Sequence, residues 1–316
     1  MAPSISSLTV FTDPHDDDDQ NLDAILKAVS TISPMLCFSA LRKLEVEFSS
    51  DAPDLFEKFS RLDYLNHLVI SHEVGMARPI GRGCFAALQN IEFWVRGEDP
   101  LLELLTDFSF PRLQSALFSI DGPSDITASR RILDALCSGS PSLCALTLNY
   151  QQREIIEHPP MELLEPLLAL SGMKELEIST TGGLCVSKDD IRTMARSWPE
   201  LKSLHLSYRR GGPAPPIQSI IEFAHHCPHL QQLYFPHFIC DSPTFPTTSA
   251  HSLCCKRSLL KSGRLDIDVN DVELCQKAAE FIEGIFPSEE HWEDTTVHNA
   301  GWQTVSPRTL LWFSAC

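Results

Sequence analysis

The sequence predicts an α/β fold in which short parallel strands alternate with helices as a repeated unit. Three observations support this prediction. A phrase reading Trp-Pro-Glu-Leu-Lys-Ser-Leu-His-Leu occupies residues 198–206 and has close counterparts at residues 227–235 and 140–148. Within each phrase, apolar and variable residues alternate, as they must in a strand with one buried face. Between the phrases, apolar residues recur with the 3.6-residue period of a helix.

Eight copies of the phrase can be aligned, each with apolar anchors in the pattern Leu-x-x-Leu-x-Leu. The anchors are Leu41, Leu44 and Val46; Leu65, Leu68 and Ile70; Leu88, Ile91 and Phe93; Leu113, Ala116 and Phe118; Leu143, Leu146 and Leu148; Met173, Leu176 and Ile178; Leu201, Leu204 and Leu206; and Leu230, Leu233 and Phe235. Successive middle anchors are separated by 24, 23, 25, 30, 30, 28 and 29 residues, close to the period of about 20–29 residues in leucine-rich repeats. Such units must lay their strands in parallel through right-handed crossovers. We therefore predict a leucine-rich-repeat, right-handed solenoid with a parallel inner sheet and outer helices.

Two further strands are expected outside these eight copies. Ile5, Leu8 and Val10 resemble a copy at the start of the chain, and Leu265 and Ile267 form a degraded one. The array is therefore predicted to extend beyond the aligned phrases in both directions.

Helices are expected over residues 22–32, in a short segment after Asp51, and over residues 191–198 and 271–285. Capping signals mark several helix starts. Ser187 stands three residues before Asp190, the spacing of a capping box, while Asp99-Pro100 and Pro216 stand where a helix opens. The segment after Asp51 has room for only one or two turns.

The predicted organisation is one repeat domain followed by a tail. The solenoid is assigned to residues 1–287 and includes an irregular loop at about 241–261, which is rich in Ser, Thr, Pro and Cys. Residues 288–316 form an acidic C-terminal tail with no repeat that can be aligned.

Composition narrows the class of partner. The net charge of −17 argues against nucleic acid and against an anionic membrane surface, because both require clustered Lys and Arg. A basic or neutral protein partner fits better, although acidity that serves only solubility is the alternative. No apolar run approaches the ~20 residues of a membrane span, and no secretory signal is present. The 11 cysteines and the lack of an Asn-x-Ser/Thr sequon suit a reducing compartment, cytoplasmic or nuclear.

Several clusters imitate sites of chemistry without matching their spacing. His225, His226, Cys227, His229, His237 and Cys240 lack the second half of a zinc framework. Residues 266–271 begin like a calcium loop but lack its glycine and closing glutamate. The acidic run at residues 16–19 suits a solvated helix start. For Cys254 and Cys255, only Lys256 and Arg257 stand nearby in the sequence to lower the thiol pKa and so make a thiol reactive. With no nucleophile elbow, P-loop or dinucleotide fingerprint, we expect no catalytic residue, metal or cofactor.

The positions between the anchors remain as a candidate binding surface. Their side chains should point to the concave inner face of the sheet. The residues selected for protein binding are Glu45, Glu47, Glu92, Trp94, Leu117, Thr147, Asn149, Glu175, Glu177, His205 and Tyr234. Trp94 and Leu117 are expected on adjacent strands, where an aromatic beside an aliphatic residue with a polar rim suits a binding hot spot. The alternative is that a loop or the tail covers Trp94.

The repeat turns resemble the leucine-rich-repeat region of fungal F-box-like proteins. The resemblance covers roughly residues 4–287 and rests on Ser-Trp-Pro-Glu-Leu-Lys-Ser-Leu, His-Cys-Pro-His-Leu-Gln-Gln-Leu and Phe-Ile-Glu-Gly-Ile-Phe-Pro. It implies a substrate-recruiting subunit of a ubiquitin ligase, in which F-box helices dock the ligase adaptor and the repeats hold the substrate. No F-box helices precede Ile5 in this sequence, so the sequence does not support the ligase adaptor as a partner. We expect either a longer F-box protein or a partner that covers the first strand.

The function predicted from the sequence is a non-enzymatic protein-interaction scaffold that resembles the substrate-recruiting part of an F-box protein. The alternative is an orphan structural or regulatory repeat protein with no ligase link.

Overall fold

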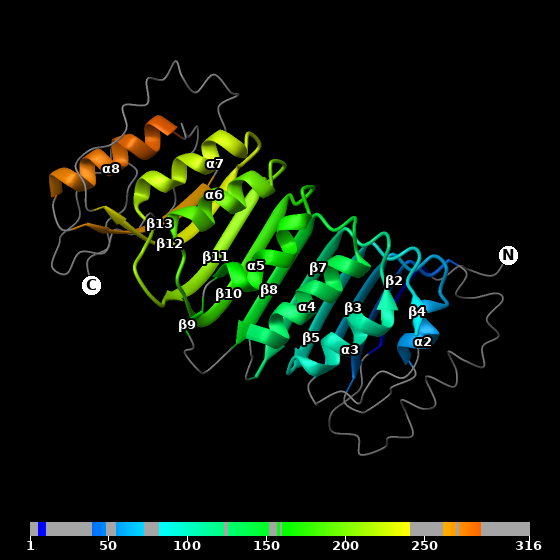
Figure 1. The fold of residues 1–316 in the computed structure, drawn as a ribbon. Helices are drawn as coiled ribbons and strands as arrows, with labels where there is room; N and C mark the ends of the chain where they lie inside the picture. The colour runs from blue at the N-terminus through cyan, green and yellow to red at the C-terminus, as the bar shows by residue number, and fades with distance from the viewer. Residues whose placement is uncertain are drawn as a thin grey trace. The chain divides into compact units, whose positions relative to one another are not determined.

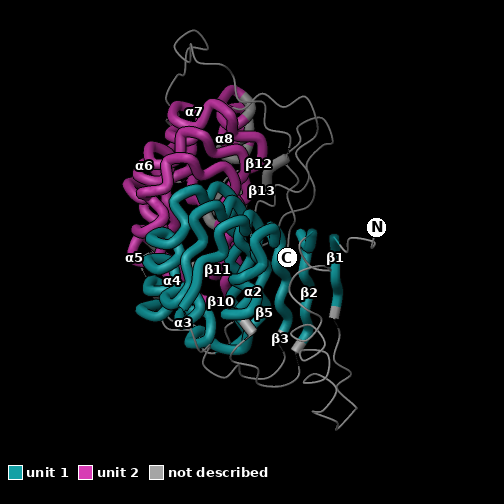
Figure 2. The backbone as a smooth tube through the Cα atoms, turned by 90° about the vertical axis from the view of Figure 1, so that its right-hand side faces the viewer, with its two compact units in different colours: residues 1–152 teal, residues 153–316 magenta. Residues whose placement is uncertain are grey.

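The structure is a computed structural model that describes residues 6–10, 40–48, 55–72, 82–122, 126–151, 157–158, 160–240, 262–269 and 272–285. These residues form an α/β arrangement of mostly parallel strands with helices. The chain divides into two compact units, Met1–Gln152 and Arg153–Cys316 (Figure 2). None of the described helices is long and apolar enough to cross a bilayer.

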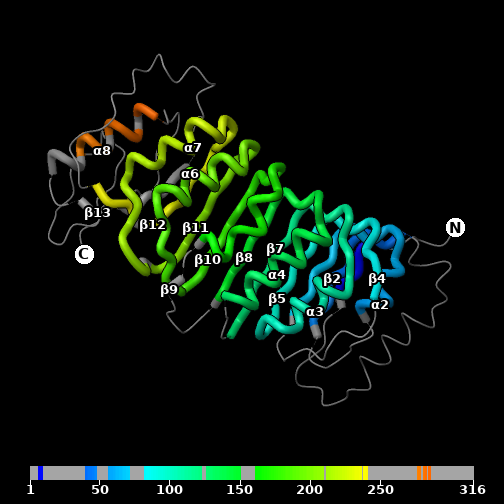
Figure 3. Tube along the Cα trace, in the orientation of Figure 1, coloured from blue at the N-terminus to red at the C-terminus, as the bar shows by residue number. Residues whose placement is uncertain are grey.

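Unit 1 contains a parallel sheet whose strands follow one another in chain order (Figure 3). They are β1 (Ser7–Val10), β2 (Lys43–Phe48), β3 (His67–His72), β5 (Asn90–Arg96), β7 (Ser115–Asp121) and β8 (Ala145–Gln151). A separate short pair joins β4 (Gly83–Cys84) and β6 (Phe108–Ser109). The helices are α2 (Leu55–Ser60), α3 (Asp99–Asp107) and α4 (Ile126–Gly139), and Figure 1 shows α3 and α4 against one face of the sheet.

Unit 2 repeats the same strand-and-helix alternation. Its strands are β9 (Glu157–His158), β10 (Glu175–Leu184), β11 (Ser203–Arg210), β12 (Gln232–Cys240) and β13 (Ser262–Val269). The last four pair in parallel in chain order, and β9 pairs with β10. Its helical segments are α5 (Pro160–Leu164), the 3-10 segment η1 (Glu165–Ala169), α6 (Lys188–Ser197), the 3-10 segment η2 (Ile217–Ile220), α7 (Ile221–His226) and α8 (Val272–Ile285).

The repeated phrase has one backbone structure in both units. In each copy from the second to the eighth, the amide of the first anchor donates to the carbonyl three residues earlier, as Leu65 does to Leu62 (3.1 Å) and Leu201 to Trp198 (3.1 Å). The next turn then joins the preceding repeat. Asn66 N and His67 N both donate to Arg42 O, at 2.9 and 3.0 Å. The periodic sequence therefore gives a periodic hydrogen-bond pattern within each unit.

The anchors form the core on the helix-covered side. All of the predicted anchor side chains are at most 4% exposed. In unit 1, phenylalanines fill the space between sheet and helices: the ring centroids of Phe56 and Phe93 are 5.9 Å apart, and Phe85 stacks on Phe110 at 5.3 Å. Burying a large apolar side chain in this way stabilises the fold by about 1.5–3 kcal/mol.

A buried polar cluster joins two neighbouring repeats of unit 1. Ser129 of α4 donates a hydrogen bond from its hydroxyl to the carboxylate of Glu98, and both residues are buried. Tyr150 of β8 lies close to them. Burial raises the pKa of the Tyr150 phenol, the nearby charge of Glu98 raises it further, and the Ser129 hydroxyl opposes the shift. The phenol therefore stays protonated in the core.

In unit 2, side-chain hydrogen bonds join positions one repeat apart. Trp198 is fully buried and donates from its indole Nε1 to Leu167 O at 3.0 Å. Cys227 takes the corresponding place in the next repeat, with its Sγ 3.5 Å from the carbonyl oxygens of Ala195 and Trp198. Burial raises the pKa of the Cys227 thiol to about 12.

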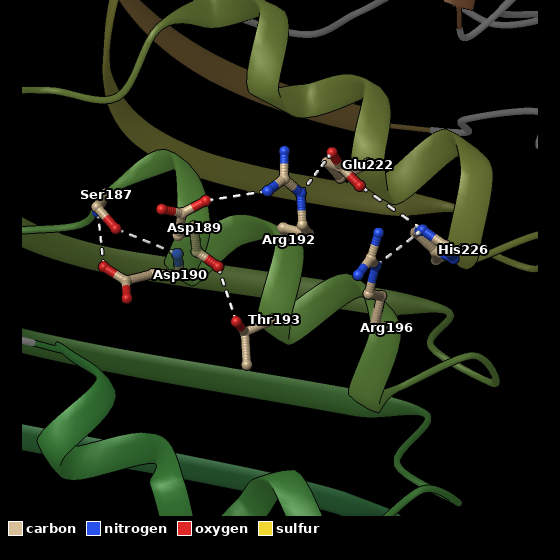
Figure 4. Close-up of polar contacts among 8 residues, drawn as sticks. All are labelled: Ser187, Asp189, Asp190, Arg192, Thr193, Arg196, Glu222 and His226. Atoms are coloured by element: carbon tan, nitrogen blue, oxygen red, sulfur yellow. Dashed lines mark hydrogen bonds and ion pairs between the residues drawn. The ribbon is translucent and has the colours of Figure 1, made fainter.

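Charged side chains tie α6 to α7 on the helical side of unit 2 (Figure 4). Arg192 donates from Nε to Glu222 Oε1 at 3.0 Å, and Glu222 Oε2 lies 3.6 Å from His226 Nε2. Arg196 donates from Nε to the same His226 nitrogen at 3.4 Å. The two arginine contacts again join positions one repeat apart, whereas Glu222 and His226 are four residues apart on α7.

Most of the predicted helix starts are confirmed. Ser187 caps α6 through a capping box with Asp190, α3 opens at Asp99-Pro100, and α2 is short, as expected after Asp51. After Pro216 the helix begins with a 3-10 segment. The predicted strands around Leu8 and Leu265 are present as β1 and β13, and the last predicted helix is α8. The predicted helix at 22–32, the loop at 241–261 and the tail at 288–316 lie outside the described residues.

Two glycines shape the ends of neighbouring strands in unit 1. Gly97 and Gly122 directly follow β5 and β7 and have φ angles of 84° and 126°. Only glycine adopts such angles without steric cost. The turn at Gly97 is held by a hydrogen bond from its amide to Asp121 O at 2.8 Å.

Candidate binding face of the sheet

Side chains on the strands alternate between the anchor side and the opposite side, which we call the open face. On β5, Ile91, Phe93 and Val95 are buried, whereas Glu92 is half-buried and Trp94 exposed. Every residue selected from the sequence for binding lies on this open face, within one unit or the other. The alternation expected from the phrase is thus the alternation observed.

In unit 1 the open face is arranged in rows that cross the strands. One row, by pairing register, is Glu45, Val69, Glu92, Leu117 and Thr147. The next row is Glu47, Ser71, Trp94, Ser119 and Asn149. The structure therefore brings seven of the selected residues onto two adjacent rows.

Trp94 is the most exposed apolar group on this part of the sheet. Its side chain is 37% exposed, and among the described residues only Tyr64 is another exposed large hydrophobic residue. Serines stand in register on both sides, Ser71 on β3 and Ser119 on β7, so the flanking side chains are small. Leu117 occupies the diagonal position on β7, within reach of a large side chain. The predicted placement of Trp94 and Leu117 on adjacent strands is confirmed, and the described residues leave Trp94 exposed.

Ionisable groups on the open face of unit 1 lie close together in pairs. Lys43 Nζ lies 3.4 Å from Glu45 Oε2. His67 Nε2 lies 3.5 Å from Glu92 Oε1, a separation at which the imidazole nitrogen makes no hydrogen bond. The surroundings of Trp94 are therefore polar, with their acidic groups partly balanced.

Unit 2 presents a different set of side chains on the equivalent rows. Glu177, His205 and Tyr234 stand in register on β10, β11 and β12. His205 Nδ1 lies 3.4 Å from Glu177 Oε1, and the ring centroids of His205 and Tyr234 are 4.9 Å apart with an interplanar angle of 41°. Glu175 lies on the same face of β10 and is exposed. We call Glu175, Glu177, His205 and Tyr234 the acidic-aromatic patch.

On the adjacent row of unit 2, Ser203 donates from its hydroxyl to Gln232 Oε1 at 3.0 Å. Sequence reasoning placed both residues on this face but did not select them, because neither type signals binding alone. Their contact joins residues one repeat apart. Their separation by one repeat was the signal from which this contact could have been predicted.

The clusters that imitate metal sites are placed by the structure mainly at helix ends and strands. His225 and His226 end α7, Cys227 is buried against backbone carbonyls, and Cys240 ends β12. Among the described residues, no group of three or more His, Cys, Asp or Glu side chains could hold a metal ion. Residues 16–19, Cys254 and Cys255 lie outside the described ranges.

The open face also lacks an assembled nucleophile where it is described. The Glu177–His205 pair resembles a base with its orienting carboxylate, but no serine or cysteine of the described chain hydrogen-bonds to His205. What the rows offer is a set of apolar, aromatic and charged contacts. Such a set suits recognition.

The sequence matches no protein-family model. It also matches no curated protein with significance.

Proposed function

We propose that this chain is a non-enzymatic protein-interaction scaffold, built as a leucine-rich-repeat solenoid, that binds a partner protein through the open face of its sheet. The observation that carries the proposal is Trp94, an exposed indole diagonal to Leu117 on a face whose other side chains are mostly polar. Tryptophans of this kind dominate the binding energy of many protein interfaces.

The hydrogen bonds between repeats support the solenoid. Side-chain bonds join residues 31 positions apart from Ser129 to Glu98 and from Trp198 to Leu167, and 30 apart from Arg192 to Glu222. Each spacing is one repeat length. Bonds of this period are expected when every repeat packs against the next one along the chain.

Capture of partners from a cell lysate tests the binding role. The immobilised full chain should retain one or more proteins that a Trp94→Ala variant fails to retain. Tyr64→Ala is the matched control, because Tyr64 is 60% exposed in the turn before β3 and off the open face. Equal capture by wild type and Trp94→Ala would refute a binding role for the Trp94 region of this face.

The resemblance to fungal F-box-like proteins suggests a narrower function, recruitment of substrates for ubiquitin ligation in the cytoplasm or nucleus. The competing proposal is a structural or regulatory repeat protein with no ligase link. Identification of the captured proteins separates the two. A ligase adaptor among the proteins supports ligase recruitment, and its absence at adequate depth supports the orphan role.

A further inference from the structure

The acidic-aromatic patch of unit 2 has an unbalanced charge. Its rows hold Glu175 and Glu177 on β10, and the open-face positions of β11 and β12 add uncharged Ser, Gln and Tyr side chains together with His205. Arg209 lies four residues beyond His205 along β11, about 13 Å at the rise of an extended strand. Arg264 follows on β13 in register with Tyr234. Over β10 and β11, the patch therefore carries two carboxylates and no lysine or arginine.

Carboxylates beside aromatic rings suit one chemical class of ligand. A guanidinium or ammonium group forms charge-assisted hydrogen bonds with a carboxylate and is attracted to the face of an aromatic ring. In the patch, Glu177 is 42% exposed at its side chain, and Tyr234 stands two strands away across His205. A planar guanidinium is especially suited, because it binds carboxylates in a fork and stacks on rings.

We propose that the acidic-aromatic patch recognises an arginine or lysine side chain of a partner protein. This inference rests on the proposed binding function and adds the chemistry of one contact. Glu175 and Glu177 supply the charge, and the ring of Tyr234, tilted by 41° against that of His205, supplies the surface on which the cation lies. The contrast with unit 1 favours this assignment, because there Lys43 already lies 3.4 Å from Glu45.

A peptide-binding measurement on the full chain tests the inference. The probe is a short fluorescent peptide with two arginines separated by glycine, and matched peptides carry lysine or glutamate instead. Anisotropy is measured at about pH 8 and at about 50 mM salt, where screening is weak. The arginine peptide should bind, the lysine peptide should bind more weakly, and the glutamate peptide should not bind.

Variants that neutralise carboxylates locate the site. The double variant Glu175→Gln, Glu177→Gln should weaken the arginine peptide about tenfold, since it removes both carboxylates. Glu200→Gln is the control: this carboxylate is exposed in the turn before β11, away from the patch, and should change affinity less than twofold. Tyr234→Ala should also weaken binding several-fold. Thermal melts of each variant establish that it is folded.

Three outcomes would overturn the inference: no binding of the arginine peptide to the wild-type chain, equal binding of the glutamate peptide, or equal effects of the patch variant and Glu200→Gln. None of them touches the Trp94 capture experiment, which tests the general binding role separately. Equal capture by wild type and Trp94→Ala, together with intact peptide binding, would refute the role of Trp94 alone.

Discussion

The open faces of the two units share one scaffold and differ in chemistry. In unit 1 the central row places an indole, Trp94, between serines and diagonal to Leu117. In unit 2 a row places a carboxylate, an imidazole and a phenol side by side, at Glu177, His205 and Tyr234; this row is equivalent to that of Glu92 and Leu117 in unit 1. The anchors beneath both are equally buried. The repeat thus holds the strand in place through its anchors and leaves the positions between them free to carry different contacts.

The largest expected effect tests the shared scaffold. Leu146→Ala in unit 1 and Leu204→Ala in unit 2 should each lower the free energy of unfolding by about 2–5 kcal/mol, because both side chains are at most 1% exposed and truncation leaves a cavity. Urea denaturation of the full chain measures both. A cost well below this range in either unit would show that its anchors are not equivalent.

The second prediction concerns the apolar contact of unit 1. Trp94→Ala should weaken binding of a captured partner by about 2–4 kcal/mol while the melting temperature stays nearly constant. Isothermal titration with the purified partner measures the affinity, with Tyr64→Ala as the control. If Trp94→Ala unfolds the chain instead, the indole belongs to the core and not to a binding surface.

The salt dependence of binding should further distinguish the acidic-aromatic patch from the Trp94 contact. Raising salt from about 50 to about 300 mM shortens the Debye length to below 10 Å and should weaken arginine-peptide binding several-fold. The effect of Trp94→Ala on partner affinity should change less than twofold over the same range, because indole burial is not electrostatic. Similar salt slopes for both would contradict the chemical contrast.

The smallest effect is expected for two thiols, one in each unit. Burial, aided by the charge of Asp134, raises the pKa of Cys137 to about 12, and burial raises that of Cys227 to about 12. Since the thiolate is the reactive form, neither should be alkylated at about pH 8 in the folded chain. Exposed Cys84 should react and serves as the internal control in site-resolved mass spectrometry.

The raised pKa values of these two thiols also predict how the stability of the chain changes with pH. A thiol in the unfolded chain ionises near its ordinary pKa of 9.0, whereas these two hold their protons to about 12. Ionisation therefore favours the unfolded chain, and the contribution of these thiols to stability should fall between about pH 9 and pH 12. Denaturation at a series of pH values should show a smaller decline in a Cys227→Ala variant.

Alternation was enough to predict the anchors and the side of the sheet on which each binding candidate lies. A strand with one buried face repeats every two residues, so a phrase such as the one at residues 198–206 assigns each side chain to a face. The capping box at Ser187 and Asp190 was likewise readable, because its contacts lie three residues apart. Patterns among residues close together in the sequence therefore predict the structure that those residues form.

Contacts between repeats were not readable in the same way. The buried cluster of Glu98, Ser129 and Tyr150 joins residues from different repeats, and none of them stands out by type. The two-residue strands at Gly83–Cys84 and Phe108–Ser109 are too short to show a period. The chemistry of the acidic-aromatic patch also depends on register, which places His205 beside Glu177 only once the strands pair.

The register shifts in β10 and β12 limit the footprint that a partner can occupy on unit 2. Pairing of β10 with β11 is interrupted between Ser179 and Gly183, and pairing of β12 with β13 between Phe235 and Phe238. Along β10, an uninterrupted length of strand runs only from Glu175 to Ser179, about 13 Å. A partner contact confined to that length along the strand can be enlarged only across the sheet, by one more strand at each step of about 4.8 Å. Affinity in this architecture would therefore grow with the number of repeats that a partner spans, and a partner that spans one repeat fewer should lose the contacts of one strand.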